Sequence, residues 1–171
     1  MPFKEPSPKW LAIVLNIVAL AIAGLLAIPF MSLSGPYLYQ DGAFPSFILG
    51  LVCALVAMVP HELLHASCFK EEVGVYLWPK GGAMFVLGLE DMSKGRFIFM
   101  SLLPNIVFGW VPFSVFLFFP QLVGLGVFGL IGTSGGAGDY VNAFNALTQV
   151  PKDAAIYMSG ARTFWYRRTA A

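Results

Sequence analysis

The residues whose types and spacing could do chemistry lie together at positions 60–65, which read PHELLH. The chain has two histidines, His61 and His65, and helical spacing puts both on one face, one turn apart. Both imidazoles could then bind one metal ion, while Glu62 beside them acts as the general base on a water molecule. The pattern predicts a site for one zinc ion, although such ligands also suit other divalent metals. The alternative is a solvated polar helix end, which rarely has this spacing.

The composition indicates that this motif belongs to a membrane protein. The chain has 171 residues, of which 58% are hydrophobic and 11% are charged, whereas a soluble domain carries about 25% charged residues. So few charges cannot cover the surface of a soluble domain of this size. The net charge of +1 shows no basic excess, which argues against a nucleic-acid partner. The two cysteines are too few for a disulfide framework.

Four apolar segments are long enough to cross a bilayer as helices, which takes about 20 residues each. They cover about residues 10–30, 43–69, 97–119 and 122–147, with a middle loop at 70–96 and a cytoplasmic tail at 148–171. The fold class predicted is therefore an all-α polytopic membrane protein, with residues 1–171 forming a single membrane-embedded domain. Pro60 is expected to bend the second span just before the histidines. The many glycines between 124 and 138 favour close helix contacts or an unwound stretch.

The basic residues agree with this arrangement. All ten lie in the N-terminal segment, the middle loop or the tail: Lys4, Lys9, Lys70, Lys80, Lys94, Arg96, Lys152, Arg162, Arg167 and Arg168. Because basic residues concentrate on the cytoplasmic side, both termini and the middle loop are expected in the cytoplasm. We predict an integral protein of a prokaryotic plasma membrane, in contact with the lipid bilayer, with its metal site near the cytoplasmic face.

A catalytic zinc ion normally has three protein ligands and one water, so a third ligand is needed. Asp139 ends a long uncharged stretch at the same predicted membrane depth as the histidines, and it is the third ligand that we expect. Its alternative role is to cap the helix that follows, and one carboxylate could serve both purposes. Glu71 and Glu72 are weaker candidates, and Cys68, one turn from His65, is either a softer ligand or a small buried hydrophobe.

Two amides could support the reaction. A tetrahedral oxyanion needs a hydrogen-bond donor besides the metal, and Asn105 and Asn142 are candidates for this role or for holding a ligand in place. The alternative for Asn105 is a bond to backbone groups freed by Pro104.

The middle loop contains two β-prone runs, 73–78 and 83–87, separated by the turn signal Pro79-Lys80-Gly81-Gly82. We expect a small β-hairpin in this cytoplasmic loop, with an interfacial or re-entrant loop as the alternative. Its edge, which includes Val75, Leu77 and Phe85, could hold an extended substrate by strand addition. The aromatic and basic run at 164–168 is typical of an interfacial anchor, or else of a disordered end.

Together with LPN at 103–105 and GD at 138–139, the motif at 60–65 resembles the putative zincin peptidase family. More distantly it is similar to the site-2 protease clan of intramembrane metalloproteases. In that clan the third metal ligand is an aspartate on a later membrane helix, which the resemblance assigns to Asp139. The chain differs from the larger clan members in having Tyr140 after this aspartate and no room for a regulatory domain.

These observations predict a zinc-dependent, membrane-embedded endopeptidase that hydrolyses peptide bonds of a membrane or membrane-proximal protein or peptide, with Glu62 as the base on the attacking water. Two other functions are compatible with the sequence. One is a non-catalytic membrane protein with a structural metal site or a partner-binding role, for which a fourth protein ligand is expected. The other is a small transporter, which would require polar residues along several spans.

Overall fold

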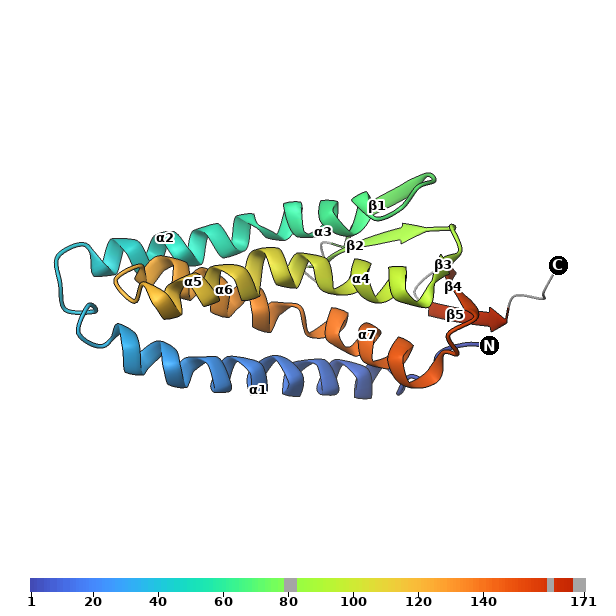
Figure 1. Ribbon diagram of the computed structural model, residues 1–171, viewed down its shortest axis with the longest axis horizontal. Helices are drawn as coiled ribbons and strands as arrows, with labels where there is room; N and C mark the ends of the chain where they lie inside the picture. The colour runs from blue at the N-terminus through green and yellow to red at the C-terminus, as the bar shows by residue number, and fades with distance from the viewer. Residues whose placement is uncertain (79–82, 160–161, 168–171) are drawn as a thin grey trace.

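Figure 1 shows the computed structural model, in which helices lie side by side along one long axis and the strands gather at the end where the chain begins. The structure describes residues 1–78, 83–159 and 162–167. Helix α1 (Pro8–Ser34) runs along the helical part of the molecule, and its 27 residues reach about 40 Å at 1.5 Å per residue. It begins with a proline, whose missing N–H costs nothing in a first turn.

The chain returns along the long axis through α2 (Ala43–Val56) and α3 (Met58–Ser67), which meet at a bend of 41°. Pro60 lies in the first turn of α3. Its ring removes a backbone donor and clashes with the carbonyl four residues earlier, which is that of Val56, the last residue of α2. The predicted bend just before the histidines is therefore confirmed.

The strands form two small antiparallel sheets. The first pairs β1 (Val73–Trp78) with β2 (Ala83–Gly88), which confirms the predicted hairpin; the turn signal at 79–82 lies outside the described residues. The second has the order β3-β4-β5 and consists of β3 (Met92–Ser93), β4 (Ala154–Ser159) and β5 (Arg162–Arg167).

Helix α4 (Lys94–Asn105) begins where the Ser93 hydroxyl accepts a hydrogen bond from the backbone N–H of Arg96 at 3.3 Å. It continues through a π-helical segment, Ile106–Trp110, into α5 (Val111–Phe118). A π-helical turn inserts an extra residue into the repeat and is common at functional sites. Here it directly follows Asn105.

The last two helices are α6 (Val123–Gly135) and α7 (Ala137–Gln149), and glycines allow α6 to approach its neighbours closely. A Cβ added at Gly50 of α2 would overlap the backbone of Gly124, and one added at Gly132 would overlap the Phe108 carbonyl. The predicted close contacts are thus present for glycines of α6, whereas Gly138 of α7 has no heavy atom within 4 Å of an added Cβ.

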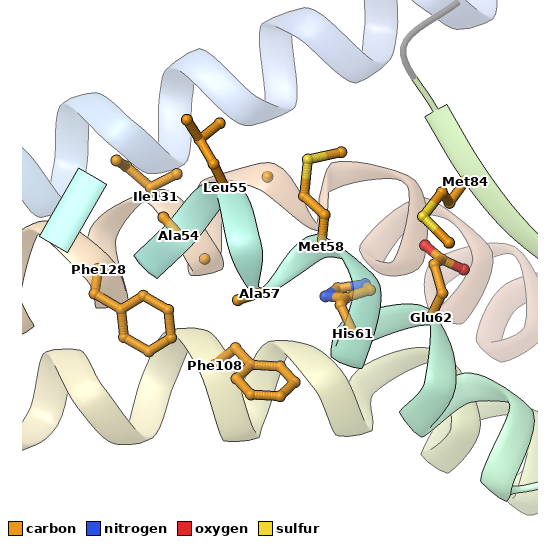
Figure 2. A pocket seen from close by; sticks show the side chains of 12 residues that line it. Ala54, Leu55, Ala57, Met58, His61, Glu62, Met84, Phe108, Phe128 and Ile131 are labelled. Carbon is orange, nitrogen blue, oxygen red and sulfur yellow. The ribbon is translucent and has the colours of Figure 1, made fainter. Parts of the chain in front are cut away.

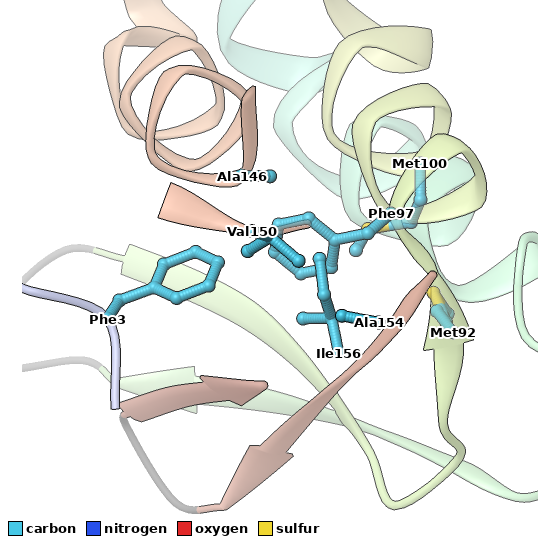
Figure 3. Close-up of a cluster of buried hydrophobic side chains, with 8 residues drawn as sticks. All are labelled: Phe3, Met92, Phe97, Met100, Ala146, Val150, Ala154 and Ile156. Carbon is cyan, nitrogen blue, oxygen red and sulfur yellow. The ribbon is translucent and has the colours of Figure 1, made fainter. Parts of the chain in front are cut away.

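Two apolar clusters hold the ends of the molecule. One joins α1, α5 and α6 through Phe30, Phe113, Phe116, Val123 and Val127. The other, shown in Figure 3, joins the N-terminal segment, β3, α4, α7 and β4 at the strand end. Its members are Phe3, Met92, Phe97, Met100, Ala146, Val150, Ala154 and Ile156.

The prediction of an all-α protein with four spans is wrong. Two helical segments, α1 and Lys94–Phe118, are long and apolar enough to cross a membrane, and the bent pair α2–α3 would make a third. The predicted span at 122–147 is divided at Gly136 into two helices of 13 residues each, about 20 Å long, against a bilayer core of about 30 Å. The predicted tail forms β4 and β5, which pair with β3 to make a second sheet.

Candidate metal centre

Three side chains from two distant parts of the chain converge beside the bend in α2–α3. The Nε2 atom of His61 lies 3.2 Å from Asp139 Oδ2, and Nε2 of His65 lies 3.3 Å from Asp139 Oδ1. One ligand atom from each residue lies within 4.8 Å of the others. Ligands about 2.0–2.2 Å from a tetrahedral zinc ion are about 3.3–3.6 Å apart, and the two histidine–aspartate separations of 3.2 and 3.3 Å lie close to this range. The donor set of two imidazoles and a carboxylate also suits zinc.

The backbone orients His65 for this role. Its Nδ1 lies 2.8 Å from the carbonyl oxygen of Met100 in α4, and a carbonyl can only accept a hydrogen bond. Nδ1 therefore carries the proton and donates it, which leaves the Nε2 lone pair directed at the centre between the three side chains. This is the usual arrangement of a metal-binding histidine. His65 is buried, while His61 is partly exposed.

Asp139 lies in the first turn of α7, where the positive end of the helix dipole favours a carboxylate. The fully buried amide of Asn105 donates to its Oδ2 at 2.8 Å. A Cβ added at Gly136 would overlap Asn105 Oδ1, so the glycine at the α6–α7 break makes room for this amide. The structure thus places Asn105 behind the carboxylate, as a group that positions Asp139.

Glu62 lies next to this cluster and faces two cavities. The larger, of about 330 Å³, extends from His61 and Glu62 between α2 and α6 and is shown in Figure 2. The smaller, of about 170 Å³, is lined by Glu62, His65, Asp139 and Asn142. The Glu62 carboxylate can therefore meet a water molecule or a substrate from either side.

The remaining predicted residues lie around the centre in different ways. Asn142 is one turn beyond Asp139 and lines the smaller cavity, where an amide could contact a substrate. Cys68 lies outside the converging cluster, and its thiol points to the carbonyl of Leu64 at 3.5 Å. Val75, Leu77 and Phe85 are exposed on the hairpin, whose strand β2 packs against α3.

Sequence reasoning missed Met100 and Met84. Met100 orients His65 through its backbone carbonyl, and a backbone role leaves no mark on the residue type. Met84, in β2, lines both cavities, and in Figure 2 it lies close to Glu62. Its place in a β-prone run next to the predicted turn gave no sign of this position, because the fold alone brings the hairpin over α3.

Comparison with known proteins identifies a family to which the chain is similar. A family model described as "Putative zincin peptidase" matches residues 54–155, a stretch that includes all three converging side chains, Glu62 and Asn105. No curated protein and no solved structure gave a match. Since the family model covers more than half of the chain, the resemblance to this family is confirmed, and the chain belongs to the putative zincin peptidase family.

Proposed function

We propose that the protein is a zinc-dependent, membrane-embedded endopeptidase that hydrolyses peptide bonds of a membrane or membrane-proximal protein. One observation carries this proposal: His61, His65 and Asp139 converge at separations that suit a single zinc ion, and Glu62 lies beside them at the meeting of two cavities. The family membership indicates a metallopeptidase, and the exposed apolar surface of α1 supports a membrane location.

The three-ligand set supports catalysis over a purely structural site. Structural zinc sites have four protein ligands, whereas catalytic sites have three and keep one position open. Within residues 1–78, 83–159 and 162–167, the group of His, Cys, Asp and Glu residues that could hold a metal contains three members. Glu62, the base that a catalytic site needs, lines the same small cavity as His65 and Asp139.

The roles of the residues follow from their places. A bound zinc ion supplies Lewis-acid activation of water and of the peptide carbonyl. Glu62 accepts the proton of the attacking water and returns it to the leaving amine. Asn105 holds Asp139, and the Met100 carbonyl holds His65, so that both ligands keep their orientation. Asn142 is the amide available to the developing oxyanion from the smaller cavity.

A helical substrate must be extended before its amide can react. The hairpin β1–β2 contacts α3, and its exposed residues include Val75 and Leu77. We expect an edge of this hairpin to hold the extended segment by strand addition. Replacing residues 73–88 by a glycine–serine linker of equal length should slow the cleavage of a membrane-spanning peptide. Unchanged cleavage with zinc content preserved would remove this role from the hairpin.

The test of the proposed function separates metal binding from catalysis. Glu62→Gln should keep zinc, because Glu62 lies outside the ligand set, and should lose at least about 100-fold in peptide cleavage, because its base is gone. His61→Ala should lose zinc as well as cleavage. Metal analysis and cleavage of a model membrane peptide, both in detergent, provide the measurements. Purified protein that takes up no zinc, or a Glu62→Gln variant that cleaves normally, would contradict the proposal.

A further inference from the structure

The larger cavity ends on reactive groups but is otherwise apolar. His61 and Glu62 form its inner end, while Phe108 and Phe128 face each other edge to face on another side, with ring centroids 6.4 Å apart. Its volume of about 330 Å³ is within the range of ligand-binding pockets. A cavity of this kind can take an apolar group of considerable size next to the site of chemistry.

Small residues create this space. Ala54 and Ala57 line the cavity from α2 and from the bend, and Gly132 and Gly135 line it from α6. Larger side chains at Ala54, Ala57 or Gly135 would fill the volume that now lies beside Glu62, whereas a Cβ at Gly132 would meet the Phe108 backbone. The break between α2 and α3 also turns His61 toward the cavity, because α3 leaves the direction of α2 there.

The second cavity indicates which molecule occupies the first. Glu62 and Met84 line both cavities, so the two spaces adjoin at the proposed catalytic base. An extended peptide whose carbonyl lies at the metal centre sends neighbouring side chains to opposite sides. The larger, apolar cavity suits a bulky apolar side chain, and the smaller cavity, of about 170 Å³, suits a smaller one.

We infer that the larger cavity binds an apolar side chain, of leucine or phenylalanine size, from a substrate residue that flanks the cleaved bond. This inference rests on the proposed function and names its substrate class. The residues that determine the specificity are then those that line the cavity without touching the metal, and Gly135 is the most accessible of them to substitution.

Gly135 offers a precise way to fill the cavity. A Cβ built on Gly135 meets no heavy atom within 4 Å, so a side chain there enters open space and leaves the packing of α6 intact. Gly24 in α1 gives the matched control, because a Cβ there also meets nothing within 4 Å and the residue lies far along the chain from the centre. A series of Ala, Val and Leu at position 135 fills the space stepwise.

The experiment measures binding rather than turnover. Acetyl-leucine hydroxamate and acetyl-glycine hydroxamate both chelate zinc, and they differ in the side chain that would enter the cavity. In zinc-loaded wild-type protein in detergent, the leucine compound should bind at least about 10-fold more tightly, as expected for burial of one leucine side chain. Gly135→Ala, Gly135→Val and Gly135→Leu should reduce this ratio in that order toward one, with zinc content unchanged, whereas Gly24→Leu should keep it.

The outcomes separate the inference from the proposed function. Equal binding of the two hydroxamates to the wild type would overturn the inference and leave the metal centre standing, and so would a ratio that the substitutions at Gly135 do not change. If a lipid chain occupied the cavity instead, the leucine side chain would bind elsewhere, and substitutions at Gly135 would not change the ratio. If zinc-loaded protein cannot be obtained, or neither compound binds to it, the metal centre and the inference both fail.

Discussion

The candidate metal centre depends on the carboxylate of Asp139, which contacts three side chains. Asp139 Oδ1 faces His65, while its Oδ2 faces His61 and also accepts the Asn105 amide. The grouping of the two histidines and Glu62 could be predicted from the sequence, because these residues lie within about one turn of the same helix. The choice of Asp139 followed from its predicted depth, and its proximity to the histidines agrees with that choice. The partner of Asn105 could not be predicted, since it depends on how α4 and α7 pack.

Loss of the Asn105 amide should weaken metal binding. Asn105→Ala removes the hydrogen bond that holds Asp139 Oδ2, and the loss of such a supporting group typically costs about 10- to 100-fold in metal affinity. Competition with a zinc chelator of known affinity measures the effect. Asn142→Ala is the matched control: it should keep zinc affinity and lower the cleavage rate. Equal zinc affinity in Asn105→Ala and wild type would show that the amide does not position the ligand.

At the scale of elements, two interruptions of helices build the site. The bend before α3 follows from Pro60, and a bend at a proline can be predicted from the sequence. The break at Gly136 was not predicted as such, because glycines also allow the close contacts that α6 makes with α2 and the π-helical segment. The π-helical segment itself has no local sequence signature; Gly109 within it packs against Thr133 of α6, a contact between distant segments.

A methyl group at the second interruption should disturb the centre. The Cβ of Gly136→Ala would overlap the buried Asn105 amide, and such overpacking typically costs about 1–3 kcal/mol. We expect a lower unfolding temperature and weaker zinc binding. The neighbouring Gly135→Ala meets open space and is the control for the change in backbone freedom. Indistinguishable unfolding temperatures for the two variants would contradict the close fit at Gly136.

An ion pair joins the end of α3 to the start of α4. The Arg96 guanidinium donates to the Glu90 carboxylate and, through Nε at 3.0 Å, to the carbonyl of Cys68. The backbone N–H groups of Lys70 and Glu71 also donate to Glu90. These bonds, that of Arg96 first, lower the pKa of Glu90 to about 2 from its usual 4.5.

This ion pair predicts a dependence of stability on pH. Because the pKa of Glu90 is lower in the folded state, its contribution to stability is complete above about pH 4.5 and is lost as the pH falls toward 2. Glu90→Gln should therefore unfold at a lower temperature than wild type at neutral pH, and this difference should shrink between pH 4.5 and 2. Thermal unfolding in detergent over this range provides the measurement, with the exposed Glu72→Gln as control. A difference that does not vary with pH would exclude the ion pair as its source.

At the scale of the whole molecule, the sheet β3–β4–β5 brings distant parts of the chain together at the strand end. The β3–β4 pairing joins residues more than 60 positions apart, and the N-terminal segment reaches β5 through the backbone bond from Phe3 to Thr163, at 2.9 Å. Local patterns could have indicated a strand in the tail, since the run TFWY at 163–166 is β-branched and aromatic and follows a Ser-Gly pair at 159–160. The pairing of the tail with β3 could not be predicted from such patterns, and the tail was interpreted instead as an anchor or a disordered end.

Phe3 should matter more to stability than its place near the chain end implies. It is buried, with its ring edge to face against Phe97 at 6.0 Å, in the cluster that also holds Met100. Phe3→Ala should cost about 3–5 kcal/mol of unfolding free energy, because it leaves a cavity in this cluster. Denaturant unfolding in detergent measures this cost, and Phe118→Ala, which removes an exposed ring, is the control. Similar costs for both variants would contradict a packed role for Phe3.

The shortness and the central place of α6 have a joint consequence for access to the metal centre. With 13 residues α6 covers about 20 Å, roughly 10 Å less than the hydrocarbon thickness of a bilayer. It packs against α1, α2, α5 and the π-helical segment, and no large apolar side chain between residues 123 and 135 is exposed, so helices rather than lipid would enclose it in a membrane. In a membrane-embedded protein, α6 would therefore end below the bilayer surface at the exposed Gly135, in the wall of the cavity that holds Glu62. A short central helix would thereby leave a route for water to the proposed base without a pore through the molecule.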